Sequence, residues 1–288
     1  MTGPAQARAQ LERIAAAERA DPAVEPAYGT RWWIGDDEVP IAVVLLHGLT
    51  NCPPQYARLA PQLHARGHAV VVPRMPYHGY RDRMTEAIAN LRASDLQMAS
   101  LRAVAAAAQC AERVVVLGIS VGATLAAWLA ARTRIDTAIA LAPFCGLHGV
   151  PGTANDALGA VLRAAPNRFS WWDPRRKEAQ EPPHGYPRFA TRSIGESLRI
   201  STDLDASPSR LHARRVVLAL NENDPVVNNP FARRRFETLR ARGIELQEVG
   251  LQGMPPIHDL IEPQIPQEQT ELVYPLLIDL IEQQPAGA

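Results

Sequence analysis

The feature that most constrains the fold is a series of short, uniformly apolar runs spaced along the chain. Branched aliphatic side chains are frequent in these runs, and no polar residue interrupts them. Strands buried on both faces have this composition, and burial on both faces is typical of a parallel sheet covered by helices. We therefore expect five buried strands, over residues 41–46, 69–72, 114–117, 138–141 and 216–220.

Longer stretches with helical character separate these runs. Residues 54–66 begin with prolines and end at Gly67, and residues 231–242 end at Gly243, which is the asymmetry expected of helices. The other expected elements are helices over 84–110, which is long enough to contain a break, 121–132 and 267–283, and short or edge strands over 31–34 and 244–249. Alternation of strand and helix predicts βαβ units, and so an α/β fold with a doubly wound, mostly parallel sheet.

One region departs from this alternation of strands and helices. Residues 145–209 contain no clean strand pattern but hold several aromatic residues and many prolines. Long structureless loops are uncommon in compact domains, and the aromatic content favours packing. We therefore predict a cap inserted before the strand at 216–220. The division is then an N-terminal helix and connector at 1–30, a core at 31–144 and 210–288, and a cap at 145–209.

Composition argues against several classes of protein. Thirty basic and 30 acidic residues give a formal net charge of zero, so no nucleic-acid-binding face is expected. No run is long and apolar enough to span a bilayer, and the N-terminus has no signal-peptide pattern. The three cysteines are far apart and suggest neither a disulfide framework nor a zinc site. We expect a cytoplasmic protein with no metal and no cofactor.

Gly118-Ile119-Ser120-Val121-Gly122 is the motif that carries the most chemical information. It follows a predicted strand directly and opens a predicted helix, which places Ser120 at the apex of a sharp turn. Strand and helix pack closely at such a turn, so residues two positions from the serine must be small. Gly118 and Gly122 meet this requirement, and Ser120 is the expected nucleophile.

An acyl-transfer site also needs two N–H donors aimed at the developing oxyanion. Val121, the residue after the nucleophile, is expected to supply one. The second is expected from Leu49, in the segment His47-Gly48-Leu49-Thr50 after an earlier strand. His47 is interpreted as a structural residue that ends the strand and orders this loop.

A serine hydroxyl needs a base, and the base needs an orienting acid. His258 is the only one of eight histidines that follows the last predicted strand, so it is the expected base. Asp224 and Glu222 both follow the strand at 216–220. We favour Asp224, which lies further into the turn, and keep Glu222 as the alternative. Asp259 adjoins His258 and is interpreted as a helix cap.

Together these residues resemble the α/β-hydrolase superfamily, and within it bacterial carboxylesterases and monoacylglycerol-lipase-like serine esterases. The similar segments are VVLLHGLT at 43–50, RMPYHGY at 74–80, VVVLGISVGATLA at 114–126, LNENDPVV at 220–227 and the late His258. The resemblance implies the α/β-hydrolase fold, a Ser120–His258–Asp224 triad and a cap before the strand that carries the acid.

The expected function is hydrolysis of carboxylic esters through an acyl-enzyme. A thioesterase, amidase, lactonase or carbon–carbon hydrolase would use the same triad and remains an alternative. A more remote alternative is a non-catalytic ligand-binding protein on a hydrolase scaffold. The expected partner is a small-molecule ester with an apolar acyl group, held by cap aromatics such as Trp171 and Trp172. The sequence leaves the oligomeric state open.

Overall fold

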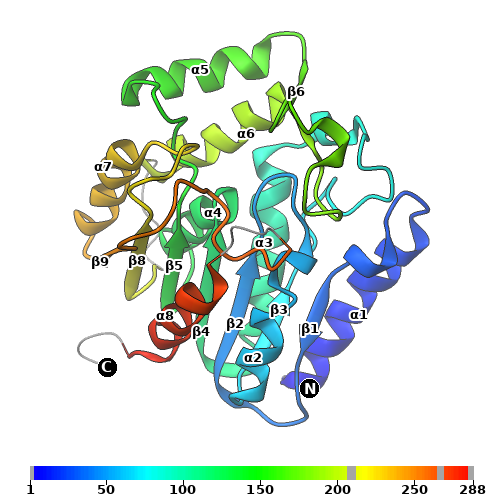
Figure 1. Cartoon of the computed structure of the whole chain (residues 1–288). Helices are drawn as coiled ribbons and strands as arrows, with labels where there is room; N and C mark the ends of the chain where they lie inside the picture. Colours follow the sequence, from blue (N-terminus) through cyan, green and yellow to red (C-terminus); the bar gives the residue numbers. More distant parts are fainter. Residues whose placement is uncertain (1–2, 206–211, 265–268, 285–288) are drawn as a thin grey trace.

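The structure, a computed structural model, describes residues 3–205, 212–264 and 269–284. Its described residues form a seven-stranded sheet in the order β1-β3-β2-β4-β5-β8-β9 (Figure 1). All neighbouring strands are parallel except β1 and β3, so the predicted mostly parallel sheet is confirmed. The strands are β1 (Arg31–Trp33), β2 (Val39–Leu46), β3 (Ala69–Val72), β4 (Ala111–Ile119), β5 (Thr137–Leu141), β8 (Arg215–Leu220) and β9 (Glu245–Gly250).

The central strands are apolar throughout because both of their faces are covered. Alternate residues of β2 belong to two separate cores, with Ala42 and Val44 in one and Val43 and Leu45 in the other. Successive side chains of a strand point to opposite faces, so a strand between two layers of helices must be apolar at every position. This confirms the interpretation of the uninterrupted apolar runs.

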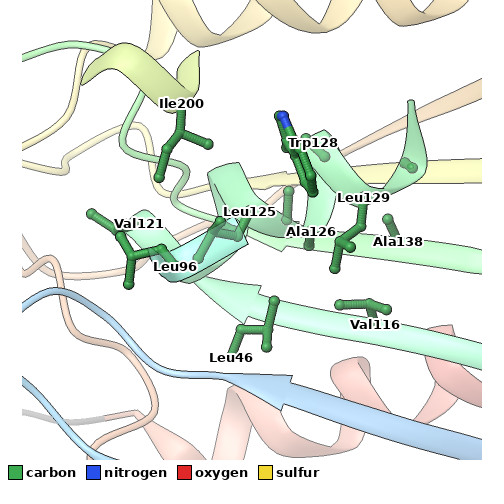
Figure 2. Close-up of a cluster of buried hydrophobic side chains, with 14 of the residues drawn as sticks. Leu46, Leu96, Val116, Val121, Leu125, Ala126, Trp128, Leu129, Ala138 and Ile200 are labelled. Atoms are coloured by element: carbon green, nitrogen blue, oxygen red, sulfur yellow. The ribbon is translucent and has the colours of Figure 1, made fainter. Parts of the chain in front are cut away.

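Helices cover the sheet on both faces, as a doubly wound fold requires (Figure 1). Figure 2 shows one core, where side chains of β2, β4 and β5 meet those of α3, α4 and α6. The helices on this face are α1 (Pro4–Ala20), α3 (Ala93–Ala107), α4 (Val121–Ala130), α6 (Thr191–Thr202) and α7 (Asn229–Arg240). The other face is covered by α2 (Leu59–Ala65) and α8 (Thr270–Glu282).

Two of the expected helices are divided in the structure, and the limits of others shift by a few residues. The helix expected at 54–66 is a 3₁₀ turn, Pro53–Tyr56, followed by α2. The stretch 84–110 divides into a 3₁₀ turn, Ala87–Asn90, and α3, because Arg92 is extended and the Asp95 carboxylate accepts its N–H, which starts a new helix. Residue 267, the expected start of the last helix, lies outside the described residues.

The chain leaves the sheet after β5 and returns to it at β8. Between them it forms α5 (Gly152–Ala164), α6 and a small antiparallel hairpin of β6 (Phe169–Trp171) and β7 (Arg188–Ala190). These elements lie beyond the carboxyl ends of the parallel strands (Figure 1). The two strands have three residues each, too few for a recognisable alternation. The predicted boundary at 209–210 lies outside the described residues, and the 145–209 limits stay a prediction.

No helix in the described ranges is long and apolar enough to cross a membrane.

Candidate active site

The predicted site residues follow different strands but meet at one edge of the sheet. Leu49 follows β2, Ser120 and Val121 follow β4, and His258 follows β9. The carboxyl ends of parallel strands lie at the same edge, where α/β folds commonly bind ligands. All four residues line one cavity of about 270 Å³.

Ser120 occupies a strained turn between β4 and α4. Its φ of 57° and ψ of −118° belong to a region that side chains rarely adopt. The flanking glycines make the turn possible. A Cβ on Gly118 would collide with the backbone of Gly122, and a Cβ on Gly122 would collide with the backbone of Leu46. The turn presents the Ser120 side chain to the cavity at the start of a helix.

His258 and Asp224 form a hydrogen-bonded pair. The Nδ1–H of His258 donates to Oδ2 of Asp224 at 2.7 Å. The other carboxylate oxygen accepts the N–H groups of Val226 and Val227, at 2.8 and 3.2 Å. Asp224 is 2% exposed, so its carboxylate is held by fixed donors away from water. Glu222 instead points to solvent and pairs with Arg233, so the structure brings Asp224 and not Glu222 to the histidine.

This environment changes the pKa of His258. Burial alone would lower the pKa of the imidazole, because it disfavours the charged form. The Asp224 carboxylate, the hydrogen bond to it and the charge of Asp259 outweigh burial, and the pKa is raised above its ordinary 6.5. Nε2 of His258 is buried and has no hydrogen-bond partner among the described residues. The imidazole therefore has one nitrogen fixed and one available in the cavity that Ser120 lines.

The two predicted oxyanion donors are also unengaged. Among the described residues, neither the Leu49 N–H nor the Val121 N–H donates a backbone or side-chain hydrogen bond. The peptide between Gly48 and Leu49 is held from its other side, since Gly48 O accepts from the Asn51 N–H at 3.2 Å and from His47 Nδ1 at 2.9 Å. A trans peptide directs its N–H opposite to its carbonyl, so these bonds fix the direction of the Leu49 N–H.

His47 is buried, as a structural residue would be. Its Nε2 accepts the Met75 N–H at 3.1 Å, which leaves Nδ1 as the donor to Gly48 O. Burial, with the neighbouring His78, holds the pKa of His47 well below its usual value, so the imidazole is neutral. Both ring nitrogens are hydrogen-bonded to the backbone, so His47 can order the loop but has no free nitrogen with which to act as the catalytic base.

The cap supplies the opposite wall of the cavity. Trp172 lines the cavity together with Tyr186 and Ile194, and its Nε1–H donates to Oγ1 of Thr50 at 2.9 Å. Trp171, the last residue of β6, is not among the residues that line the cavity, whereas Trp172 follows the end of the strand. The cap thus brings one of the two predicted tryptophans to the cavity.

Two polar residues around the cavity, Gln55 and Arg83, were not singled out from the sequence. Gln55 and Asp259 line it and are hydrogen-bonded to each other, and Arg83 reaches it from the loop after β3. Asp259 caps a turn and not a helix, since its Oδ1 accepts the N–H groups of Ile261 and Glu262. No local pattern marks Gln55 or Arg83, because their partners are distant in sequence.

No group of three or more metal-ligating side chains comes together in the part of the chain that the structure describes.

The comparison with protein families identifies the chain's relatives. A family model described as "Alpha/beta hydrolase family" matches residues 43–260, from β2 to just after the predicted base His258. The chain belongs to this family. A search of curated proteins gives no match.

Solved structures agree with this assignment of the fold. Similar α/β hydrolases include a structure from work on LipS and LipT, two metagenome-derived lipolytic enzymes, at 19% identity and a TM-score of 0.64, covering 90% of this chain and 98% of that one. A monoglyceride lipase from Saccharomyces cerevisiae is 14% identical with a TM-score of 0.61, covering 90% and 92%. A Paleococcus ferrophilus monoacylglycerol lipase is 19% identical with a TM-score of 0.59, covering 87% and 98%. Likeness at these identities shows the α/β-hydrolase fold.

Proposed function

We propose that this α/β hydrolase cleaves carboxylic esters through an acyl-enzyme on Ser120. One observation carries the proposal. His258 is bound to Asp224 through Nδ1 and leaves Nε2 unpartnered in the cavity that Ser120 lines. A buried acid, an oriented imidazole and a serine on a strained turn are the requirements for activating a hydroxyl nucleophile.

The residues divide the reaction among them. Nε2 of His258 takes the Ser120 hydroxyl proton as Oγ attacks the ester carbonyl, and the N–H groups of Leu49 and Val121 stabilise the oxyanion. His258 then gives the proton to the departing alcohol, which leaves the acyl group on Ser120. A water molecule then gives a proton to His258 and attacks the acyl carbonyl, and His258 returns that proton to the Ser120 oxygen as the acid is released. Asp224 keeps the imidazole in one tautomer and stabilises the imidazolium.

The cavity supports a substrate with an apolar group. Its wall includes apolar side chains from core and cap: Leu49, Ile119, Val121, Phe144, Trp172, Ile194 and Val226. Two polar residues of the wall, Arg83 and Gln180, are hydrogen-bonded within the protein. Arg83 donates to cap carbonyls, and Gln180 both donates to and accepts from the backbone. Arg83 shares the wall with the acidic Glu181 and Asp259, so among the described residues the wall has no cluster of basic residues that would select an anionic substrate.

Other acyl-transfer reactions use the same groups, so a substrate panel has to separate esters from thioesters, amides and lactones. A ligand-binding protein on this scaffold would have no need for an unpartnered His258 Nε2 beside a strained serine. The non-catalytic alternative is therefore the weaker one.

The test combines a covalent probe with turnover. A serine-reactive phosphonate should label the wild-type protein at Ser120, and short-chain p-nitrophenyl esters should be hydrolysed. Ser120→Ala should abolish both, because it removes the nucleophile. Labelling or turnover that persists in Ser120→Ala would contradict the proposal.

A further inference from the structure

Gln55 connects two loops that carry different parts of the proposed machinery. It lies in the 3₁₀ turn Pro53–Tyr56 and is 1% exposed. Its Oε1 accepts the Gly48 N–H at 2.9 Å, and its Nε2 donates to Oδ2 of Asp259 at 2.6 Å. Gly48 precedes the proposed oxyanion donor Leu49, and Asp259 follows the proposed base His258. One amide side chain therefore bridges the oxyanion loop and the base loop.

We propose that Gln55 is a positioning residue that fixes the base loop relative to the oxyanion loop. This inference rests on the proposed function. The Gly48 N–H needs an acceptor and the Asp259 carboxylate needs a donor, and the Gln55 amide carries both on one planar group without any change of protonation. A misplacement of about 1 Å between catalytic groups can cost about 100-fold in rate, so a rigid link between two loops has kinetic value.

The surroundings of Asp259 keep this bridge strong at neutral pH. Its carboxylate is faced by Gln55, by Asn51 Nδ2 at 3.5 Å, by the Ile261 and Glu262 N–H groups and by the neighbouring His258. Glu262 carries a second buried carboxylate, which hydrogen-bonds His184 of the cap at 2.9 Å. Burial and Glu262 raise the pKa of Asp259 to about 6, so at pH 8 it is ionised and Gln55 donates to a charged acceptor.

Gln55→Glu tests the bridge because it changes one nitrogen to oxygen. The new carboxyl keeps an acceptor for the Gly48 N–H but faces Asp259 Oδ2 across a hydrogen-bond distance. Two carboxyls this close must share a proton, and they repel each other once both are ionised. The ratio of variant kcat to wild-type kcat should be near one at about pH 6 and fall at least about tenfold by about pH 9, with KM little changed.

Exchanging donor and acceptor should repair the link. Asp259→Asn alone places an amide N–H₂ against the Gln55 N–H₂, so kcat on the alkaline plateau should fall about tenfold. The double variant Gln55→Glu/Asp259→Asn restores one donor and one acceptor in reversed order. Its kcat should return to within about threefold of wild type at about pH 8, without the decline that Gln55→Glu shows.

Gln97→Glu is the matched control. Gln97 Nε2 donates to Oδ2 of Asp203 at 3.1 Å, which makes it another glutamine–aspartate pair, but it joins α3 to the cap away from the cavity. The same change of nitrogen to oxygen there should leave kcat and its pH profile as in the wild type. Thermal unfolding of each variant at about pH 6 and about pH 9 separates loss of rate from loss of folded protein.

Two readouts keep this inference separate from the proposed function. If wild-type protein neither hydrolyses esters nor reacts with phosphonate, the proposed function fails. If wild type reacts but folded Gln55→Glu keeps the wild-type kcat and labelling rate at every pH, the positioning role is wrong. It is also wrong if the double variant is no more active than the two single variants.

Discussion

The floor and the roof of the cavity are held in place by different means. The floor consists of the loops that carry Leu49, Ser120 and His258, and the roof consists of Trp172 and a cap segment, residues 180–187, that we call the strap. Much of the floor is fixed by backbone. Glycines at 118 and 122 bring strand and helix into contact, and the Ser120 N–H donates to Leu141 O of the neighbouring strand.

Side chains form most of the links between the strap and the core. The Arg83 guanidinium donates to the carbonyls of Gln180, Pro182 and Gly185 at 2.7, 3.1 and 2.8 Å. The Tyr186 hydroxyl donates to Tyr77 O and accepts the Tyr80 N–H, both at 3.0 Å. The buried His184–Glu262 pair joins the strap to the base loop.

Because of this difference, we expect the floor to determine the rate of the reaction and the roof to determine which substrates bind. The floor combines a serine turn fixed by backbone with buried side-chain links such as Gln55 to Asp259, so it tolerates few changes and keeps the catalytic groups in one arrangement. A roof held by side chains can be altered residue by residue while the floor stays intact, which is one physical route by which one fold accepts many substrates. Substitutions in the floor should therefore change kcat, and substitutions in the roof should change KM.

The largest expected effect lies in the floor. Asp224→Asn keeps the shape of the side chain but removes the charge that fixes the His258 tautomer, so kcat should fall about 10⁴-fold. Glu222→Gln should change kcat by less than about twofold, because Glu222 lies at the surface and pairs with Arg233. Steady-state kinetics on a p-nitrophenyl ester compares the two. A larger loss in Glu222→Gln would reverse the choice of acid.

A second, smaller effect is the pH dependence of the floor. The proposed base must be neutral to accept a proton, and its pKa is raised above 6.5. Activity should therefore be complete well above that pKa and fall about tenfold per pH unit below it. The fall of kcat/KM toward acidic pH measures this pKa. If the midpoint of this fall lies below about pH 6.5, a group other than His258 controls the acidic side of the pH profile.

The smallest expected effect lies in the roof. Trp172→Leu removes the Nε1–H bond to Thr50 and part of the apolar wall, so KM should rise roughly three- to tenfold while kcat stays within about twofold. Trp171→Leu is the control, since Trp171 does not line the cavity. Both variants should show the same fall of kcat/KM at acidic pH as the wild type. A kcat loss in Trp172→Leu as large as the KM change would remove the distinction between floor and roof.

The same difference explains how much the sequence could predict. Short-range patterns mark the buried strands, the turn at Ser120 and the positions of Asp224 and His258. The parallel sheet, and the edge of the sheet at which the site lies, can therefore be predicted from the sequence. The bridge at Gln55 and the clamp at Arg83 join residues 204 and 102 positions apart. Such contacts have no local pattern. The hairpin that holds Trp171 was missed because its strands are too short to alternate.

The packing of α1 and α8 has a practical consequence for anyone who prepares part of this protein. The family match ends at residues 43 and 260, yet α1 buries Ala7, Leu11 and Ala15, and α8 buries Val273 and Leu277 against the sheet layers. A fragment trimmed to the limits of the match would lose β1 and both helices, and would expose apolar surface on each side of the sheet. The boundaries of sequence similarity are therefore narrower than the unit that covers both faces of the sheet.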